Sequence, residues 1–184
     1  MFIKTHAPQD TLIMQLLPVL QPASQILFEE YQSYTTGSEF NIHQKSDQSP
    51  VTQADLRVNL FLMQALAQVQ PVYPVLSEES DNVARHEWST CWMLDPLDGT
   101  KEFIHKRDEF TINLSLIENS KTIFSVIVVP CEQQMYLGYL DNLPYKYQFN
   151  HGQWWRYQNA KSSLSQTLQI GLSHSSKNPK YQQY

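Results

Sequence analysis

Glycine is scarce in this chain. Five glycines occur in 184 residues, which is under half of the usual share of about 7%. Because no two of them lie closer than 14 residues apart, the chain can form neither the G-x-G-x-x-G turn of dinucleotide-binding folds nor the G-x-x-x-x-G-K phosphate loop. These two large nucleotide-binding classes are excluded.

Cysteine and positive charge are also in short supply. Cys91 and Cys131 form no C-x-x-C pair, so zinc ribbons and redox dithiols are unsupported and a reduced, cytoplasmic setting is indicated. Lys and Arg number 13 against 18 Asp and Glu, which gives a net charge of -5. Since no basic run is present either, we expect no nucleic-acid partner.

Long apolar runs are missing as well. None approaches the ~18 residues that a membrane span requires, so we expect no transmembrane segment. The apolar stretch 12–20 contains Gln15 and Pro18 and follows Asp10, which argues against a secretory signal peptide. The length is sufficient for one domain with a sizeable core, or for one domain and a piece of a second.

Apolar residues recur at helical spacing in two segments. We expect a first helix over 9–34, kinked or restarted at Pro18 and Pro22, and a second over 51–70 that ends before Pro71. The second helix is expected to be largely buried through a wide apolar arc. Leu56, Leu60, Met63 and Ala67 share one face, and Phe61, Leu62, Leu66 and Val69 widen it.

Short apolar runs fill the rest of the chain and predict strands. Two runs, 72–76 and 90–94, end in acidic residues. Consecutive runs with short connections between them suggest an antiparallel meander. The further strands are expected at 110–118, 121–129, 134–140, 145–149, 154–157 and 168–172.

Carboxylates gather where predicted elements end. Twelve of the 18 acidic residues lie between Glu39 and Glu109. Among them Asp55 opens a helix, Glu78-Glu79 follows a strand and the segment 95–100 follows another. Converging carboxylates repel one another unless a cation joins them, and Mg²⁺ prefers such oxygen ligands. The pattern therefore favours a metal site that handles phosphate.

The segment 95–100, Asp-Pro-Leu-Asp-Gly-Thr, combines features of such a site. Asp98 can face the same ion as Asp95, with the carbonyl oxygen of Leu97 between them. Gly99 lets the backbone pass close to a ligand, and a helical turn beginning at Thr100 would receive a phosphate group.

Each acidic feature also has a purely structural explanation. Asp-Pro and Asp-Gly are common turn dipeptides. Thr52 and Asp55 have the spacing of a capping box, and Glu78-Glu79 suits the first turn of a helix. The occurrence of all three features in this order is what favours the metal site.

Three segments, 45–55, 74–80 and 95–103, resemble the lithium-sensitive, Mg²⁺-dependent phosphomonoesterases that include inositol monophosphatase and fructose-1,6-bisphosphatase. Lys101-Glu102-Phe103 is similar to the 3'(2'),5'-bisphosphate nucleotidase branch, CysQ type, as are 109–113 and 128–130. The resemblance implies an α+β fold, the N-terminal part of a layered α/β sandwich, with two long helices packed on a mainly antiparallel sheet.

The resemblance also implies roles for individual residues. Glu78, Asp95, Asp98 and the main-chain oxygen of Leu97 would hold two or three Mg²⁺ ions. Asp55 and Thr100 would orient and deprotonate the attacking water. The phosphorylated substrate would contact Glu78, Leu97, Asp98, Gly99 and Thr100, with help from Lys45.

The implied substrate is a small phosphorylated nucleotide, adenosine 3',5'-bisphosphate, hydrolysed to AMP and phosphate in sulfur assimilation. The implied location is cytoplasmic, or peripheral at the inner membrane. Two alternatives stay open: a catalytically impaired remnant that only binds metal or phosphate, and a sibling enzyme that acts on inositol monophosphate.

The resemblance leaves one part of the family's pattern unmatched. Residues 1–165 are expected to form the metal- and phosphate-binding domain, and 166–184 the first strand of a second subdomain that is largely missing. Family members carry a further ligating Asp there in a Trp-Asp-x-Ala motif, whereas here Arg156 follows Trp154-Trp155. The surface that this subdomain would cover predicts self-association.

Overall fold

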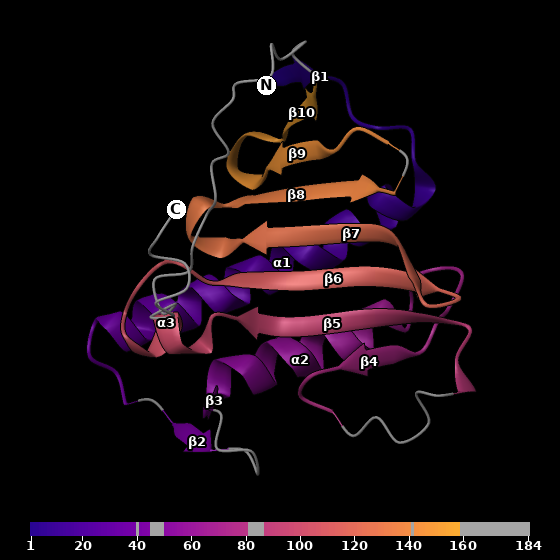
Figure 1. Ribbon diagram of the computed structural model, residues 1–184. Coiled ribbons are helices and arrows are strands. Elements are labelled where there is room, and N and C mark those ends of the chain that lie inside the picture. The colour runs from indigo at the N-terminus through magenta and orange to yellow at the C-terminus, as the bar shows by residue number, and fades with distance from the viewer. Residues whose placement is uncertain (40, 45–49, 81–86, 141, 159–184) are drawn as a thin grey trace, which may run out of the picture.

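The computed structural model describes residues 1–39, 41–44, 50–80, 87–140 and 142–158. An eight-stranded sheet forms one layer, and helices α1 and α2 lie behind it as a second layer (Figure 1). The strand order is β1-β10-β9-β8-β7-β6-β5-β4, and every neighbouring pair is antiparallel except β4 with β5. The α+β class with a mainly antiparallel sheet is confirmed.

The elements have the following bounds. The helices are α1 Thr11–Thr35, α2 Gln53–Leu66 and α3 Thr100–Ile104, with 3₁₀ turns η2 Pro130–Glu132 and η3 Phe149–His151. The large sheet contains β1 Phe2–Thr5, β4 Val75–Ser77, β5 Thr90–Asp98, β6 Thr111–Glu118, β7 Lys121–Val129, β8 Gln134–Tyr139, β9 Tyr145–Gln148 and β10 Gln153–Tyr157. A separate two-stranded sheet pairs β2 Ile42–Gln44 with β3 Pro50–Thr52.

Helix α1 is a single helix that includes Pro18 and Pro22, so the predicted restart is wrong. Each proline removes one backbone donor, but the helix buries an apolar side against α2, β7 and η2. The carboxylate of Asp10 caps its first turn by accepting the N–H of Ile13 at 3.0 Å. Packing and capping together keep the helix continuous.

Among the described residues, α1 is also the one helix whose length and composition would suffice to cross a membrane. Several of its apolar residues lie in the hydrophobic core, where Leu16, Leu20 and Leu27 are fully buried, whereas Met14 is 47% exposed. The core therefore accounts for the apolar character of one side of α1.

Helix α2 buries Leu62 and Leu66 of the predicted apolar arc, but not its centre. Leu56 and Leu60 are 46% and 61% exposed, whereas the polar Asp55 and Asn59 are buried beside Val58. The helix begins after Thr52, which is its N-cap, and ends at Leu66 rather than near residue 70. The buried polar residues have hydrogen-bond partners in the site, and they share this face with the buried Ala54, Val58, Leu62 and Leu66.

Strand β5 continues to Asp98, four residues beyond the predicted end. Its register with β6 shifts between Asp95 and Asp98, where Pro96 has no N–H to donate to the ladder. Strand β1 was not predicted. It pairs with β10, which lies near the other end of the described sequence. The predicted strand 168–172 and the boundary at 165 lie outside the described residues.

An aromatic cluster fastens α3 to the end of α1. The ring of Phe103 lies 5.4 Å from Tyr31, 6.0 Å from Tyr34 and 5.1 Å from Phe110, measured between ring centroids. The hydroxyl of Tyr34 also donates to the carbonyl of Ile104 at 3.0 Å. Because Phe103 is fully buried, the short helix has a fixed position next to the end of β5.

Candidate metal and phosphate site

Three segments that are far apart in the sequence meet at one end of the sheet. They are the first turn of α2 with Asp55, the loop after β4 with Glu78, and the segment from Asp95 to Thr100 that leads from β5 into α3. The hydrogen bond between Thr100 and Asp55 and the electrostatic coupling of Asp95 to Glu78 and Asp98 link these segments. The fold thus brings the three acidic segments to the same end of the sheet.

The two carboxylate oxygens of Asp55 have different partners. Oδ2 accepts the N–H of Thr52 at 2.8 Å and the hydroxyl of Thr52 at 2.5 Å, which completes a capping box. Oδ1 faces Thr100, whose hydroxyl lies 3.3 Å away. The helix-capping role of Asp55 and its predicted role in the site are therefore compatible, because capping uses Oδ2 and leaves Oδ1 facing Thr100.

Burial raises the pKa of the Asp55 carboxyl. The hydrogen bonds from Thr52 and Thr100 act in the opposite direction, since they stabilise the ionised form. The balance still lies above the usual range, so Asp55 holds a proton more readily than an exposed aspartate does.

Thr100 stands at the start of α3 between two acceptors. Its hydroxyl oxygen is 3.3 Å from Asp55 Oδ1 and 3.2 Å from the carbonyl oxygen of Leu97. Since a hydroxyl has one proton to donate, the two acceptors share it. The predicted helical turn at Thr100 is confirmed.

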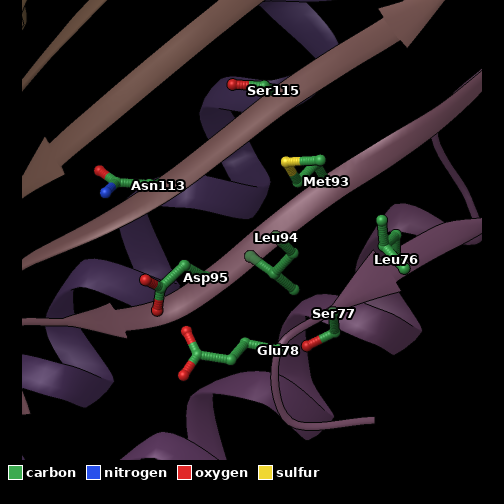
Figure 2. Close-up of a pocket in the computed structure, with 8 residues that line it drawn as sticks. All are labelled: Leu76, Ser77, Glu78, Met93, Leu94, Asp95, Asn113 and Ser115. Carbon is green, nitrogen blue, oxygen red and sulfur yellow. The ribbon is translucent and has the colours of Figure 1, made fainter. Parts of the chain in front are cut away.

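Asp95 and Glu78 turn their carboxylates toward one another across the gap between β5 and the loop after β4 (Figure 2). Burial, followed by the negative charges of Glu78 and Asp98, raises the pKa of Asp95 to about 7. One oxygen of Asp95 accepts the N–H of Leu97 at 3.1 Å. Two neighbouring carboxylates that resist simultaneous ionisation fit a place where a cation would bind.

The two carboxylates line a hollow of about 370 Å³. Its remaining walls come from β4, β5 and β6, and half of these residues are apolar (Figure 2). They are Leu76, Ser77, Met93, Leu94, Asn113 and Ser115. The hollow thus has an acidic end and an apolar floor.

Asn113 is a site residue that the sequence did not single out. Its side-chain amide donates to Asp98 Oδ2 at 2.8 Å and accepts the hydroxyl of Thr111 at 3.1 Å. Asn113 lies opposite Asp95 in the register of β5 and β6. The alternation of side chains along β6 would indicate which face of the sheet Asn113 occupies. Its contact with Asp98, however, depends on how β6 is aligned with β5, which the sequence does not give.

Gly99 joins β5 to α3 in a left-handed conformation, with φ 95°. A Cβ at this position would lie 2.8 Å from the carbonyl oxygen of Glu109 and 3.2 Å from Phe110 Cα. Glycine is therefore required here for two separate reasons, the backbone angle and the close approach of the segment at Glu109; the predicted approach of a ligand stays a prediction.

The donor set fits a divalent cation by its chemistry. Carboxylate and carbonyl oxygens are the ligands of Mg²⁺, and after burial the negative charges of Glu78 and Asp98 are what raise the pKa of Asp95. In the described part of the chain, however, no three acidic, His or Cys side chains already converge on one point. Asp98 is exposed and held by Asn113, and Lys45 lies outside the described residues.

The profile of the inositol monophosphatase family matches residues 9–183. The chain belongs to this family of phosphatases, as the motif segments predicted.

The similarity to its nucleotidase branch is also confirmed. The 3'(2'),5'-bisphosphate nucleotidase CysQ of Escherichia coli O157:H7 is 41% identical over 107 residues, which are 57% of this chain and 44% of that protein. CysQ of Haemophilus influenzae is 36% identical over 135 residues, 69% of this chain and 50% of that protein. The chain spans about half the length of these curated relatives.

Solved structures agree with the fold. CysQ from Bacteroides thetaiotaomicron is 33% identical with a TM-score of 0.61, and the match covers 73% of this chain and 48% of that one. The suhB protein of Bartonella henselae, at 21% identity and a TM-score of 0.65 over 73% and 51% of the chains, supports the fold alone. So does an IMPase/NADP phosphatase complexed with Mg²⁺ and phosphate, at 22% and 0.60 over 73% and 51%.

Replacement of Gly99 by alanine tests the close approach at the site. Gly37 has nearly the same φ, 100° against 95°, but a Cβ there would meet nothing within 4 Å. The strain of a left-handed alanine, about 1–2 kcal/mol, is therefore common to both variants. We expect Gly99→Ala to lower the free energy of unfolding by about 1–3 kcal/mol more than Gly37→Ala, measured by urea denaturation. Equal losses would contradict the close packing of Glu109 on Gly99.

The raised pKa of Asp95 predicts a pH dependence of stability in metal-free protein. The folded state keeps the proton up to about pH 7, whereas the unfolded chain loses it near 3.8. This contribution to stability is present below the unfolded pKa and is lost as the pH rises through about 7. In the presence of EDTA, raising the pH from 5 to 8 should lower the urea concentration at the unfolding midpoint more for the parent than for Asp95→Asn.

Mg²⁺ should remove the larger decrease of the parent's urea midpoint between pH 5 and pH 8, because a bound cation stabilises the ionised carboxylate. Glu118→Gln, at the other end of β6, serves as the matched control and should behave as the parent does. A relative fall that is the same with Mg²⁺ and with EDTA would show that no cation binds at Asp95.

Proposed function

We propose that this chain carries the site of a Mg²⁺-dependent phosphomonoesterase that removes the 3'-phosphate of adenosine 3',5'-bisphosphate, which yields AMP and phosphate for sulfur assimilation in the cytoplasm. The observation that carries the proposal is the position of Asp55 Oδ1 and Thr100 Oγ1, which lie 3.3 Å apart. They are next to Asp95 and Asp98 of β5 and to Glu78 in the loop after β4. The similarity to CysQ nucleotidases supports the choice of substrate.

The chain's own residues would prepare the attacking water. Asp55 Oδ2 is engaged by Thr52, so Oδ1 is the oxygen that can accept a proton from water. Thr100 Oγ1 can accept a hydrogen bond from the same water while its own proton points to the carbonyl of Leu97, 3.2 Å away. The capping box thus holds the base, and the start of α3 holds the orienting hydroxyl.

Glu78, Asp95, Asp98 and the Leu97 carbonyl would hold Mg²⁺, two or three ions in all. The bound ions would supply Lewis-acid stabilisation of the entering and leaving oxygens. Gly99 and Thr100 would lie closest to the transferred phosphate, at the turn that leads from β5 into α3. Lys45 is retained as an assisting residue, and residues 1–165 as the metal- and phosphate-binding domain.

The decisive assay measures phosphate release from adenosine 3',5'-bisphosphate by the 184-residue chain with Mg²⁺ and with EDTA. We expect release that depends on Mg²⁺ and falls about 10²-fold in Asp98→Asn, since the loss of a metal-binding group typically costs at least that much. Glu118→Gln is the control that removes a carboxylate from the same sheet outside the site. Inositol monophosphate, assayed in parallel, should be the poorer substrate.

Each contrary result selects one alternative. Faster release from inositol monophosphate would identify the sibling activity. Absent release together with binding of Mg²⁺ or phosphate, measured by calorimetry, would identify the impaired remnant. Release that is unaffected by EDTA would contradict the metal-dependent mechanism altogether.

A second proposal concerns self-association through the face of the sheet away from α1 and α2. On this face Met93 is 47% and Ile127 46% exposed, and no described helix covers it (Figure 1). Its two ends also differ in charge: Glu78 and Asp95 lie at the β4–β5 end, and Lys146 lies on β9 toward the other end. A second copy in antiparallel alignment would pair unlike ends and cover the apolar centre.

Sedimentation velocity over a range of concentrations checks this association. The parent chain should shift from monomer to dimer, whereas Ile127→Lys should remain monomeric because a charge would be buried at the centre of the face. Leu60→Lys, on the exposed side of α2, is the control and should dimerise like the parent. A parent that stays monomeric at all concentrations would contradict the proposal.

A further inference from the structure

A buried amide that the proposed reaction does not use lies behind the loop of Glu78. Asn59 on α2 is 9% exposed and stands one helical turn after Asp55 on the same face. Its Oδ1 accepts the hydroxyl of Ser77 at 2.6 Å, and its Nδ2 donates to the hydroxyl of Ser80 at 3.3 Å. Since a buried amide is costly without such partners, this arrangement ties α2 firmly to the loop.

The loop that Asn59 holds is the one that carries Glu78. The hydroxyl of Ser77 also accepts the N–H of Glu79 at 3.2 Å, and Ser77 itself is fully buried. On the other side, the N–H of Glu78 donates to the carbonyl of Leu94 at 3.0 Å. The backbone at Glu78 is therefore fixed between strand β5 and a single side chain of α2.

We infer that Asn59 is a positioning residue of the metal site: it fixes the carboxylate of Glu78 relative to Asp95, and the affinity for a divalent cation depends on it although it is not a ligand. The inference rests on the metal site of the proposed function. Asp55 and Asn59 lie one helical turn apart on the same buried face of α2. The same helix therefore positions both the proton-accepting carboxylate of Asp55 and the loop that carries Glu78.

Removal of a group that orients a metal ligand typically weakens metal affinity 10–100-fold. We therefore expect Asn59→Ala and Ser77→Ala each to weaken the binding of Mn²⁺ by about that factor, measured on the 184-residue chain by electron paramagnetic resonance. The affinity loss in the double variant should be smaller than the sum of the two single losses in free energy, because both substitutions break the hydrogen bond between Ser77 and Asn59.

Val58→Ala is the matched control. Val58 is fully buried next to Asn59 on the same helix, so its truncation lowers stability without touching the hydrogen bonds of the loop. Urea denaturation of all variants ranks their stability, and Mn²⁺ affinity should not follow that ranking: Val58→Ala should bind as the parent does.

Three results would overturn the inference in distinguishable ways. Parent-like affinity in Asn59→Ala, or in Ser77→Ala should the first variant fail to fold, would show that the hydrogen bonds do not position the ligand. An equal loss in Val58→Ala would reduce the effect to general destabilisation. A parent chain that binds no Mn²⁺ would overturn the metal site itself, and the inference with it.

Discussion

Repulsion among Glu78, Asp95 and Asp98 is the physical constraint on which this end of the fold depends. Negative charges at close range raise the free energy of the folded chain unless donors or a cation offset them. The donors that hold Asp55, Asp95 and Asp98 are neutral: the N–H and hydroxyl of Thr52, the N–H of Leu97 and the amide of Asn113. Neutral donors fix the positions of the carboxylates but leave their negative charge in place, so a cation still gains by binding.

Rigid packing behind the site counteracts the remaining repulsion. The rings of Tyr31, Phe103 and Phe110 meet within 5.4 Å of one another and hold α3 against α1. Helix α2 is held to α1 by Arg57, which pairs with the mostly buried Glu30 at 2.5 Å. The acidic segments are thus attached to elements whose own stability comes from the core, a common way of maintaining an unfavourable local charge arrangement.

Sequence patterns were sufficient where the determining interactions are local. The capping box at Thr52, the turn at Gly99 and the alternation of β6 and β7 each depend on residues within a few positions, and the structure contains all of them. The burial of Asn59 on α2 could not be predicted in this way, because hydrophobicity alone favours Leu60 over Asn59. Its buried amide bonds to Ser77 and Ser80, which reach it only through the fold.

Strand β1 was missed for a similar reason of distance. Four residues with one lysine form too short a pattern to indicate a strand. Within the part of the chain that the structure describes, β1 pairs with β10 alone. Asn113 likewise becomes recognisable once the register of β5 against β6 is known. Composition and periodicity predict individual elements, but they do not predict which remote segments of the chain pair with one another.

The pairing of β1 with β10 has a consequence for the order of folding. Phe2 pairs with Tyr157, so this contact closes a loop of nearly the whole described chain, and its entropic cost is recovered only after the intervening strands have formed. The hairpins from β5 to β10 need no such closure and can assemble first. A nascent chain would therefore present β10, with its row of unpaired backbone groups, as a sheet edge until the first residues of the protein return to cover it.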